Sequence, residues 1–216
     1  MLDAVRYLIG NGIKSVDAGR LSRLERGLWF FRQWRDQGLV AAFHHRLRGR
    51  GRQASVRPVG PTAAIVESQS VRVAESVGAS TRGWGSGKKV GSRKRHIAVD
   101  CLGMPPVVLV TSASVEDRDA SLPLLKQLSR PHRKITLVWA DGGYAGRLVD
   151  LAREHHALAL TVVKRSNDSI GFTVLPRGWC VERTLARLMH RRCLIRDDER
   201  SPVDSEAVVM WLMQCS

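Results

Sequence analysis

The chain has 216 residues, 44% hydrophobic and 25% charged, which is enough for one substantial core and ordinary for a globular protein. Its 35 Lys and Arg residues outnumber 20 Asp and Glu residues, and the net charge of +15 favours a polyanionic partner, most often nucleic acid. No apolar run is long enough to span a membrane, the four cysteines form no C-x-x-C pair, and the first residues lack signal-peptide features, so we expect a cytoplasmic protein without a zinc module.

The first part of the chain is predicted to be helical. Residues 2–9 and 21–48 carry apolar residues at steps of three and four, with arginines between them in the second segment. That segment also contains Trp29, Phe30, Phe31 and Trp34. These rings fit the core of a small helical bundle or a helix-turn-helix-like DNA-binding segment, and the two are compatible. We predict a helical, DNA-binding domain over residues 1–48 and a linker rich in Gly, Pro, Ser and Arg over 49–62.

A different pattern begins after the linker and defines a second domain, residues 63–216. Strands are predicted at 63–68, as a pair within 96–113, at 135–140 and at 158–165. Helices are predicted at 118–129, 145–159, 179–192 and 205–214. The glycine-rich and very basic residues 71–95 are predicted to form an exposed loop. Strands that alternate with helices in this way indicate an α/β sheet covered by helices.

Three acidic residues stand where a sheet could bring them together. Glu67 ends the first predicted strand, Asp141 ends the strand in "KITLVWADGGYAG" (134–146), and Glu182 lies on a late helix. Ligands gather at the carboxyl ends of strands in α/β sheets, and carboxylate oxygens suit Mg²⁺ or Mn²⁺. Each acid also has an ordinary interpretation. A carboxylate before two glycines is by itself more often a turn residue, and Glu182 beside Arg183 fits a solvated helix pair.

Two basic groups are candidate DNA contacts. The first, in "GSGKKVGSRKRH" (85–96), comprises Lys88, Lys89, Arg93, Lys94 and Arg95. It is not a P-loop, because Lys89 follows Lys88 where Ser or Thr is required. The second comprises Arg183, Arg187 and Arg191, which share one face of the predicted helix 179–192. Phosphate contact without sequence readout is the functional interpretation of both. A solvated loop and an amphipathic surface helix are the alternatives.

Six segments occur in an order that resembles one protein family. They are "IVESQSV" at 65–71, "GKKVGSRKRHIAVDCLGMP" at 87–105, "DRDA" at 117–120, "VWADGGYAG" at 138–146, "GFTVLPRGWCVERTLARL" at 171–188 and "DDERSP" at 197–202. Together they resemble the DDE transposases of bacterial insertion sequences, of the small type with an upstream helical domain. The resemblance covers nearly everything from residue 29 to the end.

The resemblance implies a ribonuclease H-like fold, which is an α/β class, in which three acids bind two divalent ions. Carried over to this chain, the catalytic and metal-binding acids are Glu67, Asp141 and Glu182, and the ions are Mg²⁺ or Mn²⁺. The implied activity is metal-dependent DNA cleavage at the ends of an element, followed by strand transfer into target DNA. The implied partners are terminal inverted repeats and target DNA, bound by a homodimer associated with the bacterial nucleoid.

The chain departs from the family pattern at several places. Glu67 stands where an aspartate before Ser-Gln-Ser is usual, and its extra methylene displaces a carboxylate whose placement must be accurate to about 0.5 Å. Residues 14–28 match poorly, Gly178 replaces a common basic residue, and Asp198 replaces a usual aromatic one. We therefore predict weakened or lost catalysis. The alternatives are a non-catalytic DNA-binding relic and a related metal-dependent nuclease that hydrolyses without joining.

Overall fold

One mixed β-sheet organises the part of the protein that the computed structural model describes, namely residues 21–85, 89–163 and 178–213, with side chains from residue 26 onward. The strand order is β2-β3-β1-β5-β6, with β4 beside β3 and β7 beside β1. The strands are β1 (Ala63–Val73), β2 (Gly83–Gly85), β3 (Val90–Val99), β4 (Val107–Ser112), β5 (Leu137–Ala140), β6 (Ala159–Val162) and β7 (Arg196–Asp197). β1 is antiparallel to β3 and parallel to β5, β3 is antiparallel to β4, and β5 is parallel to β6.

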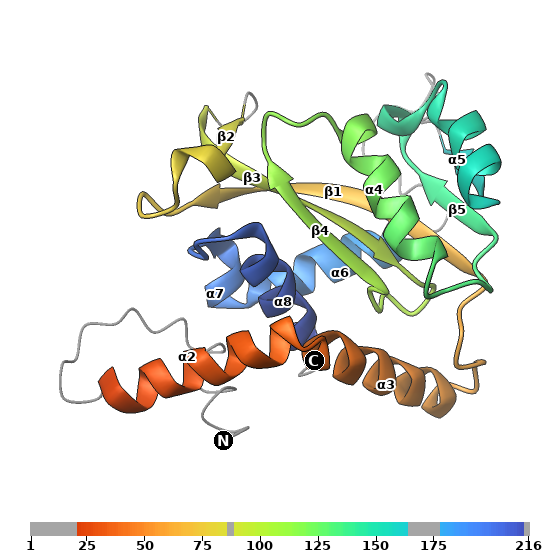
Figure 1. The fold of residues 1–216 in the computed structure, drawn as a ribbon. Helices are drawn as coiled ribbons and strands as arrows, with labels where there is room; N and C mark the ends of the chain where they lie inside the picture. The colour runs from red at the N-terminus through yellow and green to blue at the C-terminus, as the bar shows by residue number, and fades with distance from the viewer. Residues whose placement is uncertain (1–20, 86–88, 164–177, 214–216) are drawn as a thin grey trace.

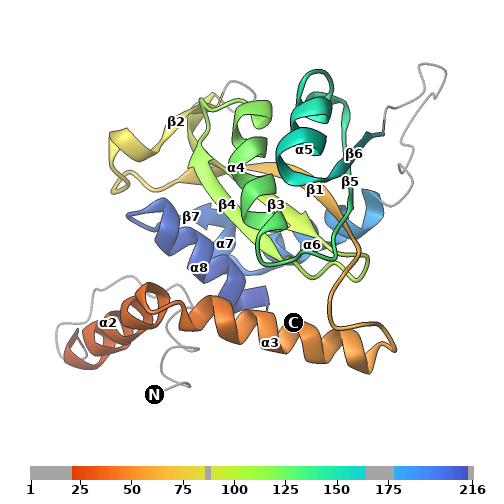
Figure 2. The same ribbon diagram turned by 45° about the vertical axis from the view of Figure 1, so that its right-hand side comes forward.

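Helices cover both faces of this sheet, as Figures 1 and 2 show. They are α2 (Leu21–Asp36), α3 (Leu39–Ala54), α4 (Asp117–Ser129), α5 (Leu148–His156), α6 (Gly178–His190), α7 (Arg192–Ile195) and α8 (Pro202–Leu212). α4 and α5 lie on one face, and α6, α7 and α8 lie on the other. α2 and α3 pack beyond α8.

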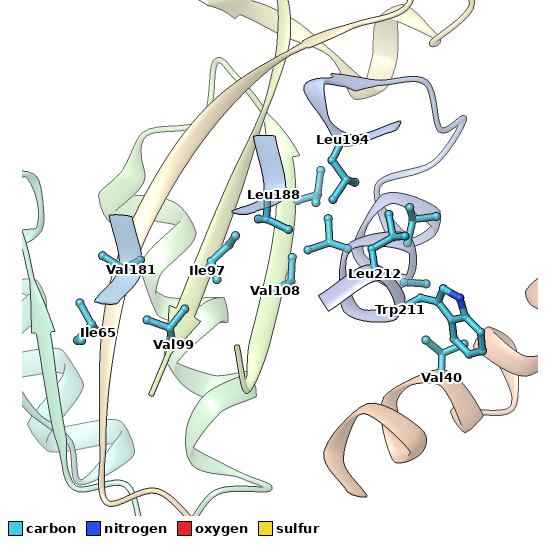
Figure 3. Close-up of a cluster of buried hydrophobic side chains, with 14 of the residues drawn as sticks. Val40, Ile65, Ile97, Val99, Val108, Val181, Leu188, Leu194, Trp211 and Leu212 are labelled. Atoms are coloured by element: carbon cyan, nitrogen blue, oxygen red, sulfur yellow. The ribbon is translucent and has the colours of Figure 1, made fainter. Parts of the chain in front are cut away.

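Two hydrophobic cores form because successive strand residues point to opposite faces of the sheet. In β1, Ile65 belongs to the core under α6 and α8, whereas Ala64 and Val66 belong to the core under α4 and α5. The neighbouring strand repeats this alternation with Ile97 and Ala98. Figure 3 shows the first core, between the sheet and α6, α7 and α8. The alternation decides which face every further β1 residue presents.

The N-terminal helices contribute to the first core. Phe31 is buried there, with its ring centroid 6.0 Å from that of Trp211 on α8, and the ring of Phe43 lies 5.8 Å from the same tryptophan. α2 and α3 are separated by two residues, and Gly38 between them has φ 72°, in the left-handed region that favours glycine. The predicted use of the aromatic rings as core side chains is confirmed for Phe31, whereas Trp29 is 55% exposed.

The predicted linker begins later than the sequence suggests, because α3 continues to Ala54. Gly49 and Gly51, which indicated a flexible segment, are packing positions within the helix. A Cβ atom at Gly49 would lie 3.1 Å from Val59, and one at Gly51 would lie 2.9 Å from Met104. The sequence pattern could not show this, because these partners are distant along the chain or follow the helix.

The exposed loop predicted over residues 71–95 is wrong at both ends. β1 continues to Val73 and β3 starts at Val90, and the two strands pair from Ile65–Val99 to Arg72–Ser92. The basic residues of the predicted loop therefore lie largely on a strand, where alternate side chains point into the protein.

The remaining predicted helices and strands are confirmed within a few residues. A mixed sheet flanked by helices, with a helical region before it, is the predicted α/β, ribonuclease H-like class. The predicted helix at 2–9 lies outside the described residues. Among the described helices, none combines the length and apolar character needed to cross a membrane.

Candidate active site

Glu67 and Asp141 occupy equivalent places on two neighbouring strands. β1 and β5 are parallel and pair through Ile65 and Trp139, so each acid lies two residues past the same pair. A step of two residues along a strand returns the side chain to the same face. Ile65 and Trp139 both belong to the core under α6. The predicted convergence of the two strand-end acids on one face therefore follows from the observed register.

The two acids line one small pocket. Its other walls are formed by Ile65, Val66, Trp139, Ala140, Val163, Gly178 and Val181. These walls are apolar and come from β1, β5, the residue after β6, and the first turn of α6. Charges interact more strongly beside such apolar walls than in water, because the effective dielectric constant is lower.

Asp141 is held in place by the turn that follows β5. Its Oδ1 accepts a hydrogen bond from the N–H of Gly143 at 2.9 Å, and it caps the 3₁₀ helix η2 (Gly142–Tyr144). The two interpretations of this carboxylate are thus both fulfilled, since it is a turn residue and it lines the pocket. A Cβ atom at Gly143 would lie 3.2 Å from Oδ1, whereas one at Gly142 would meet open space.

Glu67 is the most perturbed acid of the pocket. Burial raises its pKa to about 7, and the negative charges of Asp141, Asp117 and Glu182 contribute to the same shift. The N–H of Ser68, which donates to Glu67 Oε1 at 3.1 Å, opposes the shift. Near neutral pH, therefore, this carboxyl is protonated in a substantial fraction of molecules.

Glu182 lies on α6 beside the pocket but is exposed. α6 is anchored to the turn between β3 and β4, because the Thr184 hydroxyl donates to the carbonyl of Gly103 at 2.8 Å. Gly103 has φ 77°, and a Cβ atom there would lie 2.7 Å from Thr184 Oγ1, so the contact requires glycine. Val181 lines the pocket, and the charge of Glu182 reaches Glu67.

The acids suit a divalent cation in type and in charge. Carboxylate oxygens are the ligands that Mg²⁺ and Mn²⁺ prefer. Part of the raised pKa of Glu67 comes from neighbouring negative charges, and a bound cation would offset them. Among the described residues, no three acidic, histidine or cysteine side chains are arranged as ligands of one ion. Glu67 and Asp141 are thus brought together, while Glu182 stays at the exposed edge.

Two residues near the acids were not singled out as site residues by the sequence. The charge of Asp117, at the start of α4, acts on Glu67, and Lys94 Nζ lies 3.2 Å from its carboxylate. Tyr144 is 2% exposed, and its pKa is raised by burial and by the charges of Asp117, Glu67 and Asp141. The tyrosine of the "ADGGYAG" segment was the available signal.

Arg93 and Arg95, two predicted DNA contacts, are buried. All five N–H donors of Arg93 are used inside the protein, by the Thr81 carbonyl and hydroxyl, Asp197, and the carbonyls of Glu199 and Arg200. Arg95 donates to the carbonyl of Leu194 at 2.7 Å. With no surface left for a phosphate, neither residue is retained as a DNA contact.

The other members of that basic group differ in their surroundings. Lys94 is partly buried and donates to the carbonyl of Val115 at 2.9 Å, besides its ion pair with Asp117. Lys89 is exposed, and Lys88 lies outside the described residues.

The basic residues of the late helix are only partly free of protein contacts. The guanidinium of Arg183 lies 4.5 Å from the ring centroid of Trp179 and donates to the carbonyl of Leu102 at 3.0 Å. Arg187 is exposed on α6. Arg191 lies just past the end of the helix and is partly buried. Arg187 is therefore the most accessible of the three.

Comparisons with known proteins connect this chain to a family. A family model described as the transposase DDE domain matches residues 58–215, a range that includes all three acids. A protein of Burkholderia cepacia named as a transposase for insertion sequence element IS402 is 30% identical over 118 residues. That alignment covers 51% of the chain and 56% of the relative, so the chain spans about half the length of the curated relative it matches.

Proposed function

Because the chain belongs to the DDE transposases of insertion sequences, we propose that it cleaves DNA at the ends of its element and joins those ends to target DNA. The observation that carries this proposal is the equivalent register of Glu67 and Asp141 on parallel strands, where both line one pocket beside α6. Acids contributed by neighbouring strands and an adjacent helix are what phosphodiester chemistry with divalent ions requires.

In this proposal Glu67, Asp141 and Glu182 hold two divalent ions, Mg²⁺ or Mn²⁺. When bound, such ions supply charge stabilisation at the attacking and leaving oxygens of a phosphodiester. The chain itself positions the carboxylates. The Gly143 N–H orients Asp141, the Thr184–Gly103 contact holds α6 against the sheet, and the apolar pocket walls limit access of water.

We further propose that catalysis by this chain is weakened at Glu67. A carboxyl whose pKa is about 7 gives up part of its affinity for a cation to protons at neutral pH. One of its oxygens also accepts the N–H of Ser68. The same observations favour the alternative function, a DNA-binding relic without turnover. A nuclease that hydrolyses but does not join is distinguished by strand transfer.

DNA would be contacted near the site by the accessible basic residues Lys89 and Arg187, with Lys94 and Arg183 as weaker candidates because protein groups already engage them. Such contacts hold the phosphate backbone and carry no sequence information. We propose that a homodimer binds the two terminal repeats, in the cytoplasm and associated with the nucleoid.

Cleavage of DNA that carries the inverted repeats flanking the gene tests the proposal. With Mn²⁺ present, we expect end-specific cleavage that Asp141→Asn and Glu182→Gln each reduce by at least about 100-fold, roughly 2.7 kcal/mol of transition-state stabilisation. Asp150→Asn, an exposed acid on α5, is the matched control and should cleave like the parent chain. If the parent rate is too low, the series is made in a Glu67→Asp background. Undiminished cleavage by Asp141→Asn would reject the assigned site.

A further inference from the structure

Two stretches of the chain without acidic residues meet at one end of the sheet. Residues 37–66 carry five arginines and residues 120–140 carry four lysines and arginines, and neither stretch contains Asp or Glu. The nine basic residues are Arg46, Arg48, Arg50, Arg52, Arg57, Lys126, Arg130, Arg133 and Lys134. Positive charge concentrated in this way is a feature of surfaces that bind polyanions.

Contacts between the two stretches hold them side by side. The ring of His45 on α3 stacks on His132, with centroids 5.5 Å apart. The N–H of Thr136 donates to the carbonyl of Thr62 at 3.1 Å. A Cβ atom at Gly60 would lie 3.2 Å from the side chain of Lys134. Figure 1 shows the segment after α3 running past the start of β5.

Two of the nine basic residues serve the fold and seven face solvent. Arg52 pairs with the buried Asp100 at 2.6 Å, and Arg48 contacts His132 at 3.4 Å. Burial, followed by the charge of Arg48, lowers the pKa of His132 to about 4. The exposed residues are Arg46, Arg50, Arg57, Lys126, Arg130, Arg133 and Lys134, which we call the distal basic surface.

The distal basic surface is separate from the acids. Lys134 precedes β5 and Asp141 follows it, so the four residues of β5 lie between them, roughly 13 Å of strand. Arg46 and Arg50 stand one turn apart on α3, on the side away from the buried Arg48 and Arg52. A DNA strand bound at the pocket would therefore not cover them.

We propose that the distal basic surface binds the phosphate backbone of duplex DNA at a second site, away from the catalytic pocket. This inference rests on the proposed function, which supplies the DNA. Backbone contact needs only positive side chains without nearby acids, and it carries no sequence information. The surface would hold duplex lying outside the segment that is cleaved, and so orient the protein on its element.

Binding of a 40-base-pair duplex of arbitrary sequence tests the inference, with EDTA present so that cleavage plays no part. Arg46, Arg50 and Arg133 are changed together to Gln. An equal charge change at three exposed arginines elsewhere, Arg72, Arg118 and Arg200, is the control. We expect the first variant to lower the slope of log affinity against log salt by about 2–3, whereas the control lowers it by less than about 1.

Equal slopes in the two triple variants would overturn the inference. It would also be overturned if the first variant lost binding to phosphatidylserine vesicles while its binding to the duplex stayed unchanged, because the surface would then serve a membrane. Thermal melting of both variants checks that they are folded. The result does not depend on catalysis, so an inactive pocket and a failed second DNA site give different outcomes.

Discussion

The carboxyl groups of Glu67 and Asp141 extend from the same face of two parallel strands, each two residues past the Ile65–Trp139 pair. Their local bonds differ. Asp141 accepts an N–H from the turn ahead of it, whereas Glu67 accepts the N–H of the next residue, Ser68, at 3.1 Å. The longer glutamate side chain thus folds back onto its own backbone in a pocket where an aspartate would reach less far.

Shortening this side chain is expected to improve catalysis. Glu67→Asp should raise the Mn²⁺-dependent rate of end cleavage by about tenfold or more, an effect of roughly 1.4 kcal/mol, because the carboxylate then stands closer to the strand and nearer to its usual position. Single-turnover cleavage of labelled end DNA measures the change. Glu67→Gln is the control and should be inactive. A parent chain that already cleaves at the full rate, and gains nothing from aspartate, would contradict the argument.

The sequence could predict the acids but not their basic neighbours. Strand ends are visible as apolar runs that stop at Glu67 and Asp141, and parallel strands carry such ends to one edge of a sheet. The burial of Arg93 has no local signal, because its partner Asp197 lies 104 residues away. A basic run therefore looked like an exposed loop, although β3 passes through it.

Glycine was misleading for a similar reason. Gly49 and Gly51 read as linker residues, yet α3 passes through both. Their role appears only when Val59 and Met104 are placed against them. Local composition reports conformational freedom, whereas the close approach of another segment depends on the whole fold.

Arg93 is expected to matter for stability and not for DNA binding. Arg93→Met leaves the carboxylate of Asp197 buried without its ion-pair partner, and the exposed fractions of the two side chains are 0% and 1%. We expect a loss of about 3–5 kcal/mol in the free energy of unfolding. Urea denaturation measures this loss.

The exposed Lys89 provides the matched comparison. Lys89→Ala should change the unfolding free energy by less than about 0.5 kcal/mol, but should lower the salt slope of duplex binding by about 1. Arg93→Met should leave that slope unchanged at temperatures where it remains folded. A lowered slope in folded Arg93→Met would restore this arginine as a DNA contact.

The buried Glu206 predicts a pH-dependent stability. Burial raises its pKa to about 7, while the N–H of Val110, which donates to Oε1 at 2.8 Å, acts in the opposite direction. Because the folded-state pKa lies above the unfolded one, the contribution of this group to stability is present at low pH and is lost as the pH rises through 7. Glu206→Gln keeps an oxygen acceptor and removes the charge.

This variant should therefore be more stable than the parent at pH 8, by about 1–3 kcal/mol, and similar to it at pH 5. Urea denaturation across this pH range measures the difference. Glu154→Gln, at an exposed position on α5, should show no such pH dependence. A constant difference between Glu206→Gln and the parent from pH 5 to pH 8 would show that Glu206 does not titrate in this range.

Trp211 is expected to hold the N-terminal helices against the rest of the protein. It is 3% exposed on α8, and the rings of Phe31, Trp34 and Phe43 lie about it at 5.8–6.1 Å. Trp211→Ala should lower the unfolding free energy by about 3–5 kcal/mol and speed proteolysis within residues 55–62, which connect α3 to the sheet. Trp29→Ala, at a ring 55% exposed, should cost less than about 1 kcal/mol and leave proteolysis unchanged. If Trp211→Ala destabilises the chain without faster cleavage in that segment, the helices are held by other contacts, such as the ion pair between Arg35 and Asp204.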